Sequence, residues 1–140
     1  MKNRGFTLIE LMLVVIIISV LAAMVVPRLV GRSQEARIAA SRADVESNLA
    51  VILGLYELDN GMFPTTEQGL VALKVKPSSS PAPPNWKGPY VRKIPKDPWG
   101  HPYVYTCPGT HNTHDYDLSS YGPDGVESSD DIANWETEEE

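Results

Sequence analysis

Lysine and arginine are absent from the last third of this 140-residue chain, and cysteine is almost absent from all of it. Residues 1–96 carry 12 basic and 7 acidic side chains, whereas residues 97–140 carry 11 acidic ones and no basic one. A nucleic-acid-binding domain needs a basic surface, so the sequence predicts no nucleic-acid partner. The only cysteine, Cys107, excludes a disulfide within the chain. A small domain then needs another stabilising element.

Sequence motifs typical of catalysis are also missing. The chain contains no nucleophile elbow, no phosphate-binding glycine loop and no HExxH metalloprotease motif. Its serines, histidines and aspartates are scattered and form no recognisable triad spacing. The sequence therefore predicts a protein that is not an enzyme.

Charge is nearly absent from residues 6–26, where Glu10 is the only ionisable side chain. A helix of this length extends about 31 Å, which matches the hydrocarbon core of a bilayer, roughly 30 Å thick. The apolar residues cover every face of such a helix, so it needs apolar surroundings on all sides. Residues 6–26 are therefore predicted to form a single membrane-spanning helix.

Glu10 is unusual because an acid inside a membrane helix is costly and commonly functional. One interpretation is that its side chain reaches the lipid headgroups. The other is that it pairs with a cation in an assembly. The span contains no Lys or Arg, but cleavage after Gly5 would create a free amino group at Phe6. Residues 1–5 form a short basic leader before the apolar run, unlike a secretory signal peptide.

The segment Gly5-Phe6-Thr7-Leu8-Ile9-Glu10 resembles the processing site of type IV pilin-like proteins. The resemblance implies that a prepilin peptidase removes residues 1–5, cutting between Gly5 and Phe6, and methylates the amino group of Phe6. It implies that Phe6 and Glu10 pair between neighbouring copies during assembly. It also implies a single-pass protein of the bacterial inner membrane with residues 60–140 in the periplasm.

The helix is predicted to continue to residue 59, with an interruption at Pro27. The larger apolar residues beyond it form one helical stripe, which should pack on the domain: Ile38, Val45, Leu49, Ile52 and Tyr56. Asp59-Asn60-Gly61 is a stop signal. Four arginines lie off the stripe, and they either face solvent and lipid headgroups or contact the acidic domain of another copy: Arg28, Arg32, Arg37 and Arg42.

Residues 60–140 are predicted to form one small globular domain. Thr65 and Gln68 have capping-box spacing before a short helix that Leu70 and Leu73 hold to the domain. Residues 77–84 read as a proline-rich loop. Short strands are predicted at residues 90–94, 103–107 and 115–120, with a turn at residues 97–100, and together they form a small antiparallel sheet across the helix. The three tryptophans are interpreted as packing residues.

The stretch at residues 121–135 is the strongest candidate for a binding site. It places Asp124, Asp130 and Asp131 around glycine and proline, so that carboxylates and backbone carbonyls can alternate as hard oxygen donors for Ca²⁺. The alternative is a solvated acidic turn. A rival zinc site would use a cluster of softer donors with no common metal-site spacing: Cys107, His111, His114 and Asp115.

Two further segments resemble the major pseudopilins of type II secretion systems: residues 64–70 (PTTEQGL) and residues 121–135. The resemblance implies a calcium loop at residues 121–132, with side-chain ligands Asp124, Asp130 and Asp131 and backbone oxygens from Tyr121, Val126 and Ser128. It implies an α+β, type IV pilin-like fold with a long N-terminal helix packed on a small antiparallel sheet.

The function implied is that of a structural subunit that polymerises into the periplasmic pseudopilus and drives folded proteins across the outer membrane. Its partners would be other copies of the chain, minor pseudopilins, an inner-membrane assembly platform and the prepilin peptidase. Two alternatives remain open at this point. One is the major subunit of a surface type IV pilus, and the other is a monomeric, membrane-anchored, calcium-dependent binding module.

Overall fold

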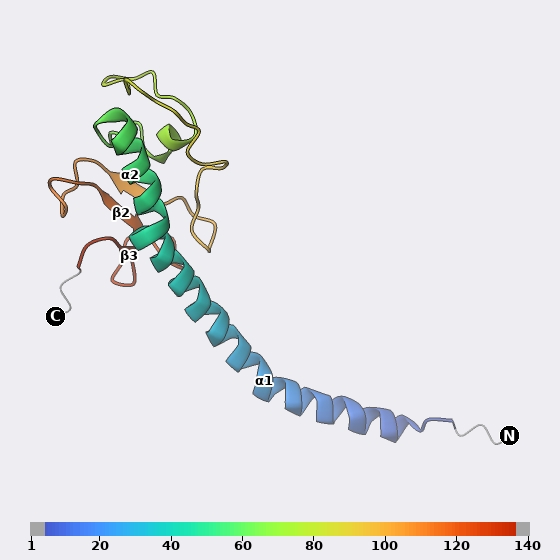
Figure 1. The fold of residues 1–140 in the computed structure, drawn as a ribbon. Coiled ribbons are helices and arrows are strands. Elements are labelled where there is room, and N and C mark those ends of the chain that lie inside the picture. The colour runs from blue at the N-terminus through green and yellow to red at the C-terminus, as the bar shows by residue number, and fades with distance from the viewer. Residues whose placement is uncertain (1–4, 137–140) are drawn as a thin grey trace. The chain divides into compact units, whose positions relative to one another are not determined.

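The computed structural model describes residues 5–136, with side chains for all of these except residues 26–30. Residues 1–4 of the expected leader and the acidic tail at residues 138–140 lie outside the described part, whereas Gly5 and Phe6, between which cleavage is expected, lie within it. Two compact units divide near residue 36. The elements in chain order are α1 (Leu8–Ala43), the π-helical segment η1 (Asp44–Asn48), α2 (Leu49–Asn60), the 3-10 helix η2 (Leu70–Leu73), β1 (Val104–Thr106), β2 (Asp117–Ser120) and β3 (Ile132–Ala133) (Figure 1).

The first unit consists of the N-terminal part of α1. Its segment Leu8–Val25 has a mean hydropathy of 3.0, and it is long and apolar enough to cross a membrane. None of this segment is buried within the described chain. Its apolar side chains therefore need cover from lipid or from other molecules.

The helix does not break at Pro27, where the sequence predicted an interruption. Its α-helical assignment continues to Ala43, and the pattern changes instead at η1. A π-helical turn accommodates one extra residue and so shifts which side chains face the domain. The helix ends at Asn60 because Gly61 adopts a left-handed conformation (φ 75°) and donates its N–H to the backbone carbonyl of Glu57. This ending confirms the predicted stop signal.

The buried face of the second unit's helix differs in part from the predicted stripe. Val45, Leu49 and Tyr56 are buried as expected, and Ile52 is partly buried and packs against this core. Ile38, however, is 38% exposed, and Leu53, which was not predicted to lie on the stripe, is fully buried. The π-helical segment explains the change, because it rotates the residues that follow relative to a regular helix. Tyr103 also donates from its hydroxyl to Asp44 at 2.9 Å, which fastens η1 to the chain leading into β1.

The sheet is antiparallel and has the order β1-β2-β3. Val104 pairs with Ser119 across β1 and β2, and Ser120 pairs with Ile132 across β2 and β3. All four residues of the central strand β2 are buried, and β2 and β3 both contact η1. Figure 1 shows β2 and β3 beside the helix. This arrangement confirms the predicted α+β architecture, with a small sheet against the second half of the helix.

Residues 90–94 are not a strand, contrary to the prediction. Tyr90 and Val91 both donate their backbone N–H groups to the carbonyl of Leu73, at 2.7 and 3.3 Å, so neither is available to a sheet ladder. Pro89 and Pro95 border the segment and lack an N–H group. The third strand is instead β3, which has only two residues and is therefore too short to produce an alternating sequence pattern.

The segment at residues 65–73 forms the predicted capping box. Thr65 donates its N–H to Gln68 Oε1 at 3.2 Å, and Gln68 donates its N–H to Thr65 Oγ1 at 3.3 Å. The 3-10 helix that follows buries Leu70 and Leu73 in the core. Trp86 donates from its indole N–H to Ala72 at 3.0 Å, which confirms a packing role.

Candidate functional site

The first candidate site is the start of α1, where Thr7 and Glu10 cap the helix reciprocally. Thr7 donates its N–H and its hydroxyl to Glu10 Oε2, both at 3.0 Å, and Glu10 donates its N–H to Thr7 Oγ1 at 3.3 Å. The carboxylate is thus held in the first turn, where the helix dipole favours a negative charge. Thr7 is a residue that the sequence reasoning missed, although its three-residue spacing from Glu10 is the capping-box signal.

The surroundings of Glu10 contain no basic side chain among the described residues of the first turn. Phe6 is 82% exposed, and Gly5 is exposed beside it. Among the described residues, Glu10 therefore makes its side-chain hydrogen bonds within its own helix, to Thr7, and its side chain is exposed.

The second candidate site is the acidic loop, residues 121–131 between β2 and β3. Gly122 and Gly125 have positive φ angles of 66° and 71°, which other residues rarely adopt. A Cβ on Gly125 would lie only 2.8 Å from the His101 ring, so the loop backbone passes directly over that ring. The His101 Nδ1 atom lies 3.3 Å from the Gly122 carbonyl oxygen. The loop therefore turns at these two glycines, and the His101 ring packs against its backbone.

The three aspartates of this loop converge on one residue, Ser128. The Ser128 hydroxyl donates to Asp124 Oδ2 at 3.4 Å and also to Asp130, while the Ser128 N–H donates to Asp131 Oδ1 at 3.2 Å. Within residues 5–136, however, no three acidic, histidine or cysteine side chains surround a common point closely enough to hold a metal. The oxygen donors have the right chemistry for Ca²⁺, and their orientation is set by hydrogen bonds to Ser128.

The carboxylates of the acidic loop repel one another electrostatically. Burial raises the pKa of Asp131, and the carboxylates of Asp130, Asp124 and Glu127 raise it further, against the lowering effect of the Ser128 N–H. Because the folded-state pKa lies above the unfolded one, the folded state loses stability as the pH rises through it. At neutral pH the ionised loop is thus strained by like charges, and a bound cation would relieve that strain.

Tyr121 and Val126, the remaining residues of the implied ligand set, lie at two points of the loop. Tyr121 is half-buried and follows β2 directly, while Val126 is exposed and donates its N–H to Asp124 Oδ1 at 3.1 Å. The geometry does not test which carbonyl oxygens would ligate a metal, so that assignment stays a prediction.

The start of the loop is anchored by Asp97, a residue the sequence reasoning placed only in a turn. Asp97 is 5% exposed, and its carboxylate accepts the N–H groups of Trp99 and His101, at 3.1 and 2.7 Å. The Ser120 hydroxyl donates to the same carboxylate at 2.8 Å and accepts the Gly122 N–H at 3.2 Å. Asp97 therefore links the turn at residues 97–101 to the end of β2, where the acidic loop begins.

The far end of the loop is anchored by Asn134. Its side-chain oxygen accepts the Leu118 N–H at 2.9 Å, and its NH₂ donates to the Tyr116 carbonyl at 3.0 Å. Next to it, Trp135 stacks on His111 with ring centroids 4.2 Å apart and an interplanar angle of 4°. Both ends of the acidic loop are thus fixed to the sheet.

Asp117 organises the neighbouring loop, residues 109–112. Its buried carboxylate accepts three backbone N–H groups, from Thr110, His111 and Asn112, at 2.6, 2.9 and 2.9 Å. The His111 ring contributes a fourth contact at 3.1 Å. Burial raises the pKa of Asp117, but these hydrogen bonds outweigh it and hold the pKa below the ordinary value.

The variant Asp117→Asn is expected to lose about 1–2 kcal/mol of unfolding free energy at pH 7, because an amide NH₂ replaces one acceptor oxygen beside N–H donors. Since the folded-state pKa of Asp117 lies below the unfolded one, its stabilisation is complete above the unfolded pKa and is lost as the pH falls through the folded one. Thermal unfolding at pH 7 and pH 3 should therefore give wild type and variant midpoints that converge at the lower pH. Asp115→Asn, at an exposed carboxylate, is the control and should change little. A gap that is the same at both pH values would contradict this assignment.

The proposed rival zinc site receives no support from the described residues. His111 is committed to Asp117 and Trp135, and Cys107 lies beside Thr66, whose hydroxyl accepts its N–H at 2.9 Å. Burial raises the pKa of Cys107, which disfavours the thiolate that a metal needs.

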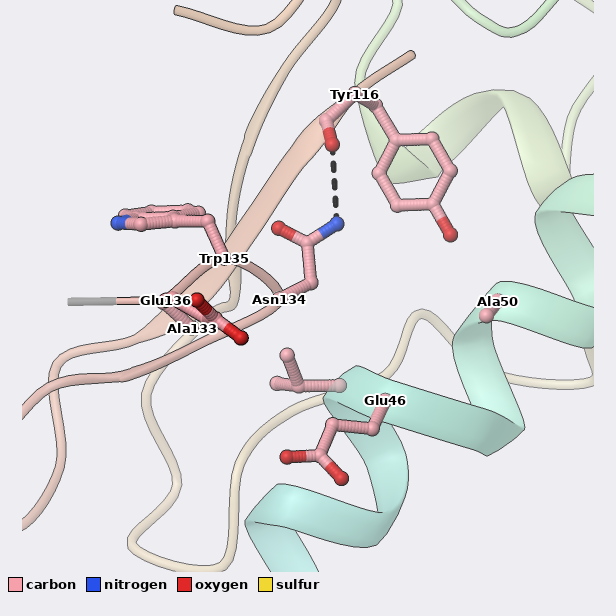
Figure 2. Close-up of a pocket in the computed structure, with 8 residues that line it drawn as sticks. Glu46, Ala50, Tyr116, Ala133, Asn134, Trp135 and Glu136 are labelled. Carbon is pink, nitrogen blue, oxygen red and sulfur yellow. Dashed lines mark hydrogen bonds between the residues drawn. The ribbon is translucent and has the colours of Figure 1, made fainter. Parts of the chain in front are cut away.

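A cavity of about 380 Å³ lies between the helix and the C-terminal strand. Figure 2 shows Glu46 on the helix at one side of it and Asn134 turned toward Tyr116 at the other. Its lining includes the carboxylates of Glu46 and Glu136 and the apolar side chains of Val45 and Ala133. The two acids make it unsuited to an anionic ligand.

Comparison with known proteins adds two family matches. The family described as type II secretion system protein G matches residues 28–135, and the prokaryotic N-terminal methylation motif matches residues 1–26. The second match covers the segment that carries Gly5, Phe6 and Glu10.

Individual relatives are similar over nearly the whole chain. The type II secretion system core protein G of Pseudomonas aeruginosa is 46% identical over 140 residues, covering 96% of each chain. The core protein G of Klebsiella pneumoniae is 48% identical over 139 residues, covering 96% of this chain and 95% of that one. A crystal structure of the major pseudopilin from the type 2 secretion system of enterohaemorrhagic Escherichia coli has a TM-score of 0.68 and 42% identity, covering 76% of this chain and 89% of that one.

Proposed function

Because the chain belongs to the type II secretion system protein G family and is a subunit of the pseudopilus, we propose that its copies polymerise into a periplasmic filament whose growth drives folded proteins across the outer membrane. The family consists of structural subunits, and no catalytic role is proposed. A surface type IV pilus and a monomeric binding module are not favoured by these relationships.

The observation that carries this proposal is the uncovered apolar helix that begins with Thr7 and Glu10. Every face of Leu8–Val25 is exposed within the described chain, so the segment is stable only in lipid or among other apolar helices. Transfer from lipid into a bundle of identical helices keeps those side chains in apolar surroundings. Assembly from the membrane is then possible without exposing the segment to water.

Glu10 would supply the specificity of this assembly. After cleavage at Gly5, the new amino group of Phe6 in one copy would meet the Glu10 carboxylate of its neighbour. An unpaired carboxylate in an apolar filament core is costly, and a pair of opposite charges with good hydrogen bonds is tolerated. Thr7 would hold the carboxylate at the helix start before pairing. The prepilin peptidase is the enzyme proposed to generate the amino group and methylate it.

The location proposed is the bacterial inner membrane, which the helix crosses once, with residues 60–140 in the periplasm. Minor pseudopilins and the inner-membrane assembly platform are the proposed partners besides other copies. The methylation motif supports this topology, as does Leu8–Val25, the one segment of residues 5–136 that is long and apolar enough to cross a membrane.

Calcium is the proposed ligand of the acidic loop. Asp124, Asp130 and Asp131 would bind it through their side chains, and Tyr121, Val126 and Ser128 through backbone oxygens. When bound, the ion would neutralise the mutual repulsion of the carboxylates. The convergence of all three aspartates on Ser128 and the raised pKa of Asp131 support this proposal. The ion would take the stabilising role that a disulfide has in other small extracytoplasmic domains.

Filament formation tests the proposed function. Cells that overproduce the full chain together with the secretion machinery should yield filaments in electron micrographs, and crosslinking in membranes should give a ladder of multiples of the subunit mass. Cells lacking the prepilin peptidase serve as the control and should give neither. Single bands in crosslinked membranes from processing-competent cells would contradict the proposal.

A further inference from the structure

The cavity between the helix and the C-terminal strand combines apolar walls with two carboxylates and no basic side chain. Its walls include Val45 and Ala133, and its two acids, Glu46 and Glu136, come from different elements. Figure 2 shows Glu46 on the helix and Glu136 on the chain that follows β3. The Glu46 side chain is 55% exposed, and Glu136 is exposed as well. The cavity is therefore open to other molecules and attracts a positively charged group.

The rest of the lining indicates which kind of cation fits. Trp135 contributes an aromatic ring, one face of which is already stacked on His111. A guanidinium group is planar, bonds to more than one carboxylate and stacks on aromatic rings, while the methylene groups of an arginine pack against apolar walls. A metal ion fits less well, because within residues 5–136 no three acidic, histidine or cysteine side chains are placed to hold one. The lining thus matches an arginine side chain.

A base of the same helix lies near Glu46 without filling the cavity. Arg42 is 3.9 Å from Glu46, but its side chain is 64% exposed and takes no part in the lining. An exposed pair of this kind contributes little to stability. Residues 97–140, which supply the opposite wall, contain no Lys or Arg. A cation that fills the cavity is therefore expected from another molecule.

Arg37 is a base without a partner in the described chain. Its side chain is exposed and forms neither a hydrogen bond nor an ion pair within residues 5–136. The adjoining positions on the helix surface, 33, 34, 40 and 41, hold no acid, whereas Arg32 has Glu35 three residues later. Alanine at positions 36, 39 and 40 leaves little side-chain bulk around Arg37. Arg37 is therefore accessible to the surface of another molecule.

The proposed filament requires a contact between two unlike surfaces. A contact that uses the same patch on both copies closes at a dimer, whereas an open filament requires two different patches that meet head to tail. We propose that the Arg37 side chain of a second copy of this chain fills the cavity and pairs with Glu46 and Glu136. The inference rests on the proposed polymerisation and names one contact through which neighbouring subunits recognise each other.

The spacing along the helix agrees with this pairing. Arg37 and Glu46 are nine residues apart, which corresponds to about 14 Å along the axis. A parallel neighbour shifted along the axis brings its Arg37 toward Glu46, and the long side chains of both residues cover part of the distance. The proposed pairing of a neighbour's Phe6 with Glu10 needs a shift in the same direction. Arg32 would need a larger shift, about 21 Å.

Charge complementarity favours this contact over a symmetric one. Two cavities that faced each other would bring Glu46 and Glu136 close to their equivalents, and two Arg37 side chains would also repel each other. Arg37 in the cavity of a neighbour instead places one base between two acids. The contact repeats from copy to copy, because each subunit offers both the base and the cavity.

Charge reversal tests the contact in the full chain, produced together with the secretion machinery. Arg37→Glu is expected to reduce filament yield severalfold, because it brings a third carboxylate to the cavity. Glu136→Arg should have a similar effect, because it places a base opposite Arg37. The double variant Arg37→Glu/Glu136→Arg restores opposite charges and should recover most of the yield. Arg32→Glu makes the same change on the same helix, and as the matched control it should leave the yield at the wild-type level.

The unfolding midpoint separates assembly from folding in this experiment. Arg37 is exposed and unpaired within the described chain, so Arg37→Glu should leave the midpoint at the wild-type value. A loss of filaments at an unchanged midpoint then reports a lost contact between copies.

Disulfide crosslinking is a second measurement that does not depend on charge repulsion. In the full chain with Cys107→Ser, the pair Arg37→Cys/Glu136→Cys is expected to give an oxidant-dependent ladder of multiples of the subunit mass. This pair removes the attraction without introducing a repulsion, so filaments should still form. Arg37→Cys/Ser80→Cys, which uses an exposed polar position of another loop, is the control and should give no ladder.

Three results would overturn the proposal. They are equal filament yields from Arg37→Glu and Arg32→Glu, a double charge variant that assembles no better than the single ones, and filaments in which Arg37→Cys/Glu136→Cys gives no ladder. Each of them leaves the proposed function intact. The absence of filaments from the wild-type chain would instead contradict polymerisation itself.

Discussion

Glu10→Ala is expected to abolish filament assembly while the chain still inserts into the membrane. The substitution removes the only charged side chain from residues 6–26, and a charge within a membrane-spanning helix opposes insertion, so insertion is not impaired. Assembly fails for the opposite reason, because the amino group of Phe6 in a neighbouring copy then has no carboxylate to pair with in an apolar core. Membrane fractionation measures insertion, and electron microscopy with crosslinking measures assembly.

The structure supplies a matched control for this experiment. The Thr7 hydroxyl donates a hydrogen bond to the Glu10 carboxylate at 3.0 Å. Thr7→Val removes this hydroxyl but keeps the Glu10 carboxylate and the shape of the side chain at position 7. If Glu10 acts only as a helix cap, the two variants should have similar effects on assembly. If Glu10 is the partner of a neighbouring amino group, Thr7→Val should assemble and Glu10→Ala should not. Filaments from Glu10→Ala at the wild-type level would contradict the proposed pairing.

Chelation of calcium is expected to lower the unfolding temperature of the wild-type chain by about 10–20 °C. Calcium present at 100 times its Kd would stabilise the folded state by about 2.7 kcal/mol. Each kcal/mol corresponds to about 4–8 °C for a domain of roughly this size. Tryptophan fluorescence is a suitable signal because Trp135 closely follows β3, the strand into which the acidic loop leads, and stacks on His111. The measurement uses the full chain in detergent micelles, with and without chelator.

Asp124→Ala should remove this response to chelator, since it deletes a proposed side-chain ligand. Glu127→Ala is the matched control, because it removes the same charge from the same loop at a residue not proposed to bind through its side chain. The control should keep most of the response. A wild-type chain whose unfolding temperature is indifferent to chelator would contradict calcium binding, whatever the variants do.

Several elements of the fold can be predicted from motifs whose residues lie close together in the sequence. The apolar run after Gly5, the Asp59-Asn60-Gly61 stop and the Thr65–Gln68 capping box each depend on residues a few positions apart. Local chemistry is enough to predict such features. The resemblance to pseudopilins, which depends on the leader, residues 64–70 and residues 121–135, is likewise confirmed by the family matches.

The parts that sequence reasoning missed depend on contacts between distant residues. Leu53 is fully buried in the core while Ile52 is only partly buried, because a π-helical segment shifts the helix register, and no motif in residues 44–48 predicts that segment. Residues 90–94 have strand-like composition but give their N–H groups to Leu73. Asp97 supports the acidic loop through Ser120, a partner 23 positions away. The Thr7–Glu10 capping box is different, because its signal was present but lay inside a segment interpreted as membrane.

The third strand of the sheet, β3, depends on the acidic loop that precedes it. Strand β3 has two residues, and it pairs with β2 only because the acidic loop returns the chain to that side. If the loop opened, β2 would keep β1 on one side and would present unpaired backbone N–H and C=O groups on the other. Such a free edge is a template for pairing with strands of other chains. The integrity of a surface loop would then govern whether the globular domains of unassembled subunits stay separate or aggregate through this edge.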